Sequence, residues 1–222
     1  MDLRKIGVIA VAFLLSNCGM GKDMKNSAHE DILPVIAVSL GMTIQQVEAG
    51  STGQVRFYNS VSQEPSDSFH KDIHHQLKYV HPNLGFTIPD MERLAISSYE
   101  DKVTIISDRP VSHFQTIDEV VALSNRYMDI IDKAGWQRAR ERTANLYSFD
   151  PTRNYASLDE VKAMFLDKTL NKSLQKVRVA SWVNNKDCIE INIERSLHFT
   201  NPPAGGADEK EYLITIEFGF DS

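Results

Sequence analysis

Histidines are the residues whose types and spacing most directly suggest chemistry. Four of the seven histidines lie in one short segment, FHKDIHHQLKYVH, at positions 69–81. His70 and His74 are four residues apart, so on a helix they would share a face and could both ligate a metal ion. No Glu stands between them as in the H-E-x-x-H pattern, and no third ligand can be identified. We therefore expect no metal site and no cofactor, and the alternative is a metal-dependent envelope enzyme that uses His70 and His74.

The second candidate for chemistry is Cys188, one of two cysteines in the chain. It begins an alternating segment in which it falls with the polar set, and its acidic neighbours Asp187 and Glu190 do not favour a reactive thiolate. We expect an incidental thiol that the fold covers at least in part. The sequence contains no G-x-S-x-G elbow, no P-loop and no G-x-G-x-x-G fingerprint. The prediction is therefore a protein without catalytic residues, that is, not an enzyme.

The N-terminus has the organisation of an export signal. Arg4 and Lys5 precede an uncharged apolar run over residues 6–15. That run is too short to cross a bilayer as a stable helix.

The next four residues, Leu15, Ser16, Asn17 and Cys18, resemble the lipobox of bacterial lipoproteins. The resemblance implies cleavage after residue 17 and acylation of Cys18 with diacylglycerol and further fatty acids of the palmitate class. Several acyl chains would hold the protein stably on a membrane. Gly19 follows the cysteine where an inner-membrane lipoprotein has Asp, which implies an outer-membrane, periplasm-facing location. The alternatives are an ordinary secretory signal or an uncleaved apolar N-terminus.

Charge restricts the classes of partner. The chain carries 24 basic and 30 acidic residues, a net charge of −6. Removal of residues 1–17 takes away Asp2, Arg4 and Lys5, which leaves 22 basic and 29 acidic residues and a net charge of −7. This balance argues against a nucleic-acid partner and against docking of the folded region on anionic lipid. With Cys18 acylated, Cys188 would have no disulfide partner, so the fold must be stable through its core.

Capping signals and hydrophobic periodicity predict the helices. Three capping boxes, Thr43 with Gln46, Thr116 with Glu119 and Ser157 with Glu160, each predict a helix start. The clearest helix spans 117–134 and ends at Gly135. Its expected buried face consists of Ile117, Val120, Val121, Ser124, Tyr127, Met128 and Ile131. A further helix is expected over 69–80, because Phe69, Ile73, Leu77 and Val80 recur at helical spacing.

Strands are expected at 54–61, 94–99, 102–108, 176–183, 188–199 and 211–220, while the apolar segment from Val35 suits a strand or a short helix. The fold class is therefore α+β, with antiparallel sheets, packed helices and a C-terminal three-stranded β meander. The expected organisation is a signal peptide at 1–17, a lipid-anchored tether at 18–30 and a globular region at 31–222. This region could be one domain or two subdomains, 31–145 and 146–222.

A second, local resemblance lies at residues 40–47, LGMTIQQV. This segment is similar to the Gly-Met-Thr-x-x-x-Val opening of the small lipoprotein subunit of the outer-membrane β-barrel assembly machinery. That family has a helix pair on a three-stranded antiparallel sheet, so the resemblance implies an α+β fold.

These observations predict a lipid-anchored periplasmic protein that works by binding. The partner would be another envelope protein, such as a basic toxin blocked by an immunity protein or an assembly factor. The expected contact is the long loop over 200–209, which joins two strands. Its candidate partner-binding residues are Asn201, Pro202, Pro203, Asp208 and Glu209. A small-ligand carrier with an apolar pocket between sheet and helices is a further alternative.

Overall fold

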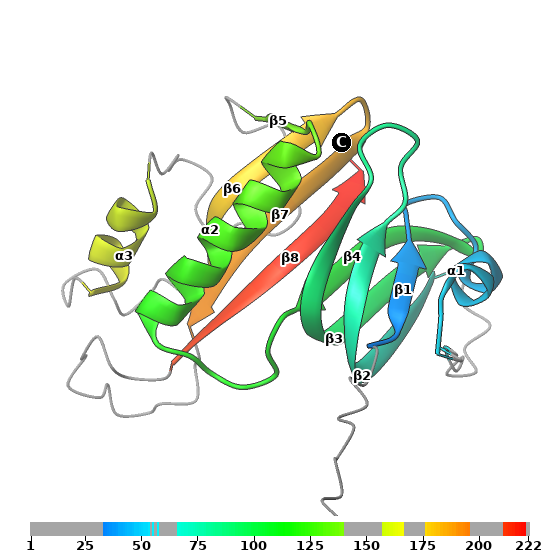
Figure 1. The fold of residues 1–222 in the computed structure, drawn as a ribbon, viewed down its shortest axis with the longest axis horizontal. Helices are drawn as coiled ribbons and strands as arrows, with labels where there is room; N and C mark the ends of the chain where they lie inside the picture. The colour runs from blue at the N-terminus through cyan, green and yellow to red at the C-terminus, as the bar shows by residue number, and fades with distance from the viewer. Residues whose placement is uncertain are drawn as a thin grey trace, which may run out of the picture. The chain divides into compact units, whose positions relative to one another are not determined.

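The described part of the chain builds three helices and one eight-stranded sheet (Figure 1). This computed structural model describes residues 33–53, 55, 57, 66–139, 157–166, 176–195 and 211–220. The elements are β1 (Val35–Val38), α1 (Ile44–Gly50), β2 (Ser66–Tyr79), β3 (Phe86–Tyr99), β4 (Lys102–Arg109), α2 (Ile117–Lys133), β5 (Gln137–Arg138), α3 (Leu158–Leu166), β6 (Lys176–Asn184), β7 (Asp187–Arg195) and β8 (Tyr212–Phe220). The α+β class is confirmed at this level.

The sheet is mixed rather than purely antiparallel as expected, because β1 pairs with β2 in parallel while the other strand pairs are antiparallel. It consists of two ribbons that meet in its middle. Its strand order is β1-β2-β3-β4-β8-β7-β6-β5, so β2–β4 and β8–β6 each pair with their sequence neighbours. Only three residue pairs join the ribbons along the β4–β8 seam, centred on Ser107 opposite Glu217. Strands from both of the possible subdomains therefore belong to the same sheet.

Helix α2 contacts strands on both sides of this seam, namely β3, β7 and β8. Thr116 and Glu119 form the predicted capping box, and Gly135 follows the helix end with φ +91°, a conformation that glycine adopts without strain. The buried face is Ile117, Val120, Ser124, Tyr127, Met128 and Ile131. The expected face is thus confirmed except at Val121, which is only half-buried. The Ser124 hydroxyl donates to the Val120 carbonyl at 2.8 Å, which satisfies it inside the apolar interface.

The predicted helix over 69–80 is wrong, because this segment is strand β2. Phe69, Ile73 and Leu77 recur every four residues, and an even spacing also places them on one face of a strand. The odd-numbered positions His75, Leu77 and Tyr79 are fully or almost fully buried in the sheet, which fits a strand period of two. The apolar spacing was therefore real, but it could not distinguish the two structures.

Most other short-range predictions agree with the structure where the residues are described, but the strand expected at 94–99 is only the second part of β3 (Phe86–Tyr99). The capping boxes at Thr43 and Ser157 precede α1 and α3. The β3–β4 hairpin turns at Glu100 and Asp101, whose φ values of 49° and 62° match a two-residue hairpin loop. The predicted strand at 54–61 lies outside the described residues, apart from the buried Val55 and Phe57.

The edge of the sheet at β1 is closed by two hydroxyl groups. The outward-facing N–H groups of Val35 and Ala37 donate to Thr52 Oγ1 at 2.8 Å and Ser51 Oγ at 3.0 Å. Unpaired edge donors invite another strand, so these bonds reduce the tendency of this edge to aggregate. Within the described residues, no helix is long and apolar enough to cross a membrane.

The packing of α2 across the seam generates a stability prediction. Val120 is completely buried, so Val120→Asp places an unpaired charge in the core and should lower the free energy of unfolding by about 3–5 kcal/mol. The control is Asn125→Asp, which adds the same charge on the exposed face of α2. Urea titration of both variants measures the effect, and equal stabilities would contradict the assigned helix face.

Candidate functional site

Two β-bulges distort the β2–β3 pairing at one place in the sheet. The register shifts occur between Asp72 and His75 and between His75 and Leu77. In the first, Ile73 and His74 lie opposite one residue of β3; in the second, two residues of β3 lie opposite one of β2. The second bulge includes Asp90, whose φ of 58° is uncommon for a residue other than glycine. Bulges re-aim side chains and are enriched next to functional sites.

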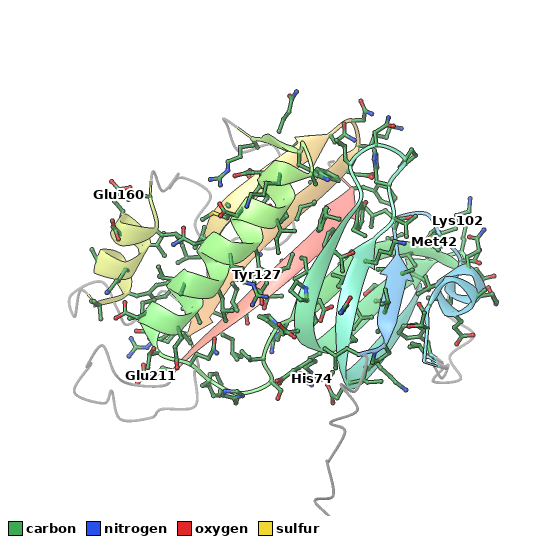
Figure 2. The ribbon with its side chains drawn as sticks, in the orientation of Figure 1. Met42, His74, Lys102, Tyr127, Glu160 and Glu211 are labelled. Atoms are coloured by element: carbon green, nitrogen blue, oxygen red, sulfur yellow. The ribbon has the colours of Figure 1, made fainter. Side chains whose placement is uncertain are left out.

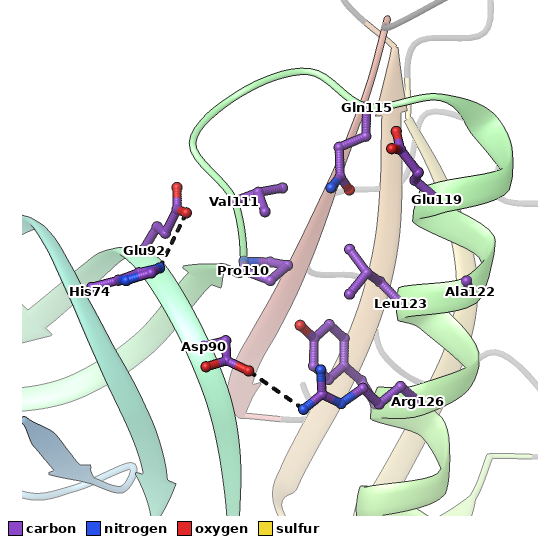
Figure 3. Close-up of a pocket in the computed structure, with 11 residues that line it drawn as sticks. His74, Asp90, Glu92, Pro110, Val111, Gln115, Glu119, Ala122, Leu123 and Arg126 are labelled. Atoms are coloured by element: carbon purple, nitrogen blue, oxygen red, sulfur yellow. Dashed lines mark ion pairs between the residues drawn. The ribbon is translucent and has the colours of Figure 1, made fainter. Parts of the chain in front are cut away.

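A cavity of about 370 Å³ lies against this bulged region (Figure 3). One wall is the β2–β3 ribbon, and the others are the segment after β4 and one side of α2. The lining residues are His74, Asp90, Glu92, Pro110, Val111, Gln115, Glu119, Ala122, Leu123, Arg126 and Tyr127. Figure 2 shows two of them, Tyr127 beneath α2 and His74 at β2. The two bulges thus direct His74 and Asp90 to the cavity.

Four titratable residues of the cavity are arranged in two pairs. His74 Nε2 lies 3.3 Å from Glu92 Oε1, and Arg126 Nη2 lies 3.5 Å from Asp90 Oδ2. Glu92 Oε2 also accepts a 2.6 Å hydrogen bond from the Ser112 N–H. Partial burial raises the pKa of Glu92, but the Ser112 hydrogen bonds and the nearby His74 and His113 outweigh it, so this pKa lies below its ordinary value. Glu92 is therefore a fixed anion near neutral pH.

Gln115 supplies an unused acceptor in the same cavity. Its backbone N–H and carbonyl both bond to Tyr212 of β8, at 2.8 and 3.0 Å, which fixes where the side chain starts. Figure 3 shows that side chain pointing from the segment before α2 into the space near Leu123. Its Oε1 atom is buried and has no hydrogen-bond partner among the described residues. A buried acceptor without a donor costs about 1–3 kcal/mol.

His75 and Asp108 form a buried pair that the sequence analysis did not identify. Both side chains are completely buried, and His75 Nε2 lies 2.8 Å from Asp108 Oδ2. The other ring nitrogen, Nδ1, lies 2.6 Å from the Ile73 carbonyl and must donate to it. Both ring nitrogens are therefore occupied, and neither can take a proton from a substrate. The one available signal was a histidine among the apolar odd-numbered positions of this segment.

The electrostatics of this pair follow from burial and mutual contact. Burial alone lowers the pKa of His75, but the hydrogen bond to Asp108 and its charge outweigh it, so the pKa of His75 is raised. Burial raises the pKa of Asp108 to about 6, although His75 opposes the rise. The pair links β2 to β4 beside the seam, which is a structural role.

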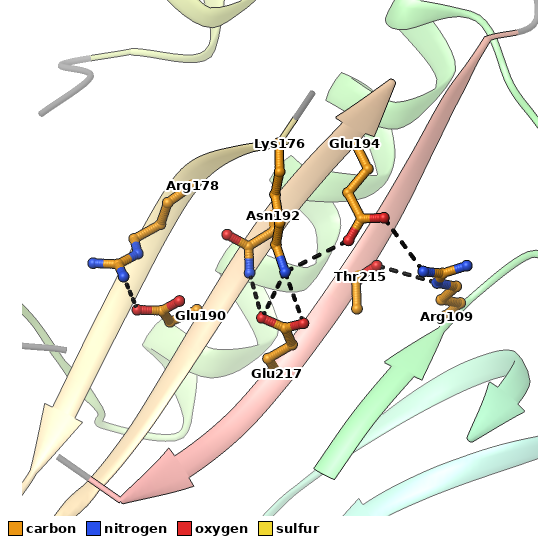
Figure 4. Close-up of polar contacts among 8 residues, drawn as sticks. All are labelled: Arg109, Lys176, Arg178, Glu190, Asn192, Glu194, Thr215 and Glu217. Carbon is orange, nitrogen blue, oxygen red and sulfur yellow. Dashed lines mark hydrogen bonds and ion pairs between the residues drawn. The ribbon is translucent and has the colours of Figure 1, made fainter. Parts of the chain in front are cut away.

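An ionic layer covers the sheet face opposite α2 (Figure 4). Its members alternate along β7 and β8 with the apolar residues that face α2. The contacts are Lys176 Nζ to Glu217 at 2.9 and 3.0 Å, Asn192 Nδ2 to Glu217 Oε2 at 2.9 Å, Arg178 Nη2 to Glu190 Oε1 at 2.5 Å, and Arg109 to Glu194 and Thr215, both at 3.3 Å. Each of the three glutamates lies next to a basic side chain, so the layer is internally neutralised.

The predicted site residues divide into those that the structure describes and those that it does not. Cys18 and the loop residues Asn201, Pro202, Pro203, Asp208 and Glu209 lie outside the described residues. His74 lines the cavity, whereas the side chain of His70 is not among those described. Residues four apart on a strand are about 13 Å apart, so the helical argument for a His70–His74 metal site no longer holds. No group of three metal-ligating side chains occurs within the described ranges.

Cys188 is completely buried, which confirms the expectation of a covered thiol. It lies on β7 opposite Val183 of β6 and Gly219 of β8. Burial of this kind is typical of a cysteine that packs rather than reacts.

The ionic layer generates a prediction on pH dependence. Burial raises the pKa of Glu190 from 4.5 to about 7, although Arg178 opposes the rise. Between those values the unfolded chain loses a proton that the folded chain keeps, so this group lowers stability as pH rises from about 4.5 to about 7. Glu190→Gln should therefore melt higher than wild type at pH 8, and the difference should shrink toward pH 5. Glu100→Gln, in the exposed β3–β4 turn, is the control, and a difference that is constant with pH would contradict the assignment.

The cavity and the ionic layer differ in what they offer to a ligand. The layer is buried, whereas the cavity combines apolar walls with charged groups that are partly exposed, the composition of a binding pocket. No protein-family model, no curated protein and no solved structure matches the chain. The cavity is therefore the candidate site on its own geometry.

Proposed function

We propose that this chain is a lipid-anchored protein of the bacterial envelope that acts by binding, through the cavity between the β2–β3 ribbon and α2. Cys18 carries the anchor, and Gly19 directs the protein to the outer membrane with its folded region in the periplasm. The partner is another envelope protein, such as a basic toxin or an assembly factor. Strands β6, β7 and β8 act as a C-terminal three-stranded meander that supports α2.

The observation that carries this proposal is the coincidence of both bulges with the cavity. Two register shifts within one strand pair cost ladder hydrogen bonds, and Asp90 adds an uncommon backbone conformation. Register shifts also occur between Ser97 and Ser98 and between Arg178 and Ala180, but of the described strand pairs only β2–β3 carries two of them. The shifts bring the polar side chains of His74 and Asp90 to the cavity, which supports selection for binding.

A small-ligand carrier is the second candidate, favoured by the size of the cavity. A volume of about 370 Å³ lies within the range of small-molecule sites, roughly 300–1,000 Å³. Mass spectrometry of molecules released from the purified full-length chain separates the candidates. A stoichiometric small molecule that depends on the cavity residues would favour the carrier.

The binding proposal is tested by photo-crosslinking in cells. A photoreactive amino acid at Ala122, which is exposed and lines the cavity, should give a discrete adduct with an envelope protein. The matched position is Tyr99, which is 52 % exposed and does not line the cavity. An adduct from Ala122 that is absent at Tyr99 is the expected result. If Ala122 gives no adduct, or the same adduct as Tyr99, the cavity is not the contact.

The anchor is tested separately with a fatty-acid probe. Wild-type protein should be labelled in cells and recovered with membranes, because several acyl chains together bind a bilayer stably. Cys18→Ser should be unlabelled, and Cys188→Ser is the control that keeps the lipobox. Label that persists in Cys18→Ser would place the anchor elsewhere.

A further inference from the structure

We infer that the cavity accepts the basic side chain of a partner protein, with lysine as the best fit: an ammonium group at the end of a flexible apolar stem. This inference rests on the proposed function and names the chemistry of its partner.

The charge balance of the cavity favours a cation. Asp90, Glu92 and Glu119 supply three carboxylates and Arg126 supplies one guanidinium, so these four side chains together carry −2. The chain as a whole is also acidic. Such a recess attracts cations, and the attraction acts mainly on the association rate.

The cavity lining combines apolar walls with polar groups, which suits the apolar stem and charged end of a lysine side chain. Val111, Ala122 and Leu123 line the walls and can pack against methylene groups. An ammonium group has three donors and no acceptor, so it complements the carboxylates of Asp90, Glu92 and Glu119.

In the free protein, the guanidinium of Arg126 already lies where a cation would bind, beside Asp90. The two groups lie 3.5 Å apart, and both side chains are more than half exposed. Exposed pairs of this kind contribute about 0–1 kcal/mol, so an incoming cation can displace Arg126 at small cost. Arg126 therefore competes with the partner's lysine, and its removal should strengthen binding.

The experiment uses the full-length chain in detergent and saturation-transfer NMR with two small probes. Nα-acetyl-lysine methylamide carries the proposed group, and Nα-acetyl-norleucine methylamide has the same stem without the ammonium. The lysine probe should bind with a dissociation constant on the order of 1 mM, as suits a few anchored atoms. The norleucine probe should show no saturation transfer at the same concentration, and the lysine signal should fall as salt rises.

Three variants test the site itself. Asp90→Asn with Glu92→Gln keeps both side-chain shapes, and Asn tolerates the positive φ of position 90, so the fold should survive. This double variant should weaken binding of the lysine probe about tenfold. Arg126→Gln should strengthen it. Asp129→Asn, which removes a charge from the exposed face of the same helix, should leave it unchanged.

Each other outcome overturns the inference. Equal binding of both probes would make the cavity an apolar site. Equal effects of the double variant and Asp129→Asn would remove the cavity from the contact. If the lysine probe fails but the Ala122 crosslink forms, the ligand class is wrong while the proposed function stands.

Discussion

The structure depends on the packing of α2 across the seam between the two ribbons. Three registered residue pairs between β4 and β8 are a short connection for a sheet of this size. The buried stripe of α2 adds apolar contact on both sides of that seam, and each fully buried aliphatic side chain contributes about 1.5–3 kcal/mol. The helix thus fixes the angle between the ribbons. Because the same helix forms one wall of the cavity, the core and the candidate site share one support.

Local signals in the sequence were enough to predict most elements but not the place of β2. Capping boxes at Thr43, Thr116 and Ser157 identified three helix starts, since a cap involves only neighbouring residues. Alternation identified the strands of the C-terminal ribbon. The prediction for 69–80 failed because a spacing of four residues fits both the helical period and the strand period. Pairing with β3 is what makes this segment a strand.

The candidate site was harder to predict, because its parts meet only through long-range pairing. Bulges arise from the register between two strands, and neither His74 nor Asp90 has a local signal for one. His75 and Asp108 are 33 residues apart, and Lys176 and Glu217 are 41 apart. The alternation of β7 did separate Cys188 and Glu190 from the isoleucines. It did not reveal that this polar face is also buried, because basic residues of β6 cover it.

The two polar regions place different demands on the fold. The ionic layer is buried and internally bonded, so its side chains hold one another in place and the arrangement is rigid. The cavity pairs are half-exposed, so water already solvates them and exchange of partner is cheap. A recess of this size can hold one or two side chains and gives modest affinity alone. Under the proposed function, the lipid anchor holds this protein on the membrane where its partner lies. This raises the effective concentration of the two proteins and so strengthens their binding without any new contact.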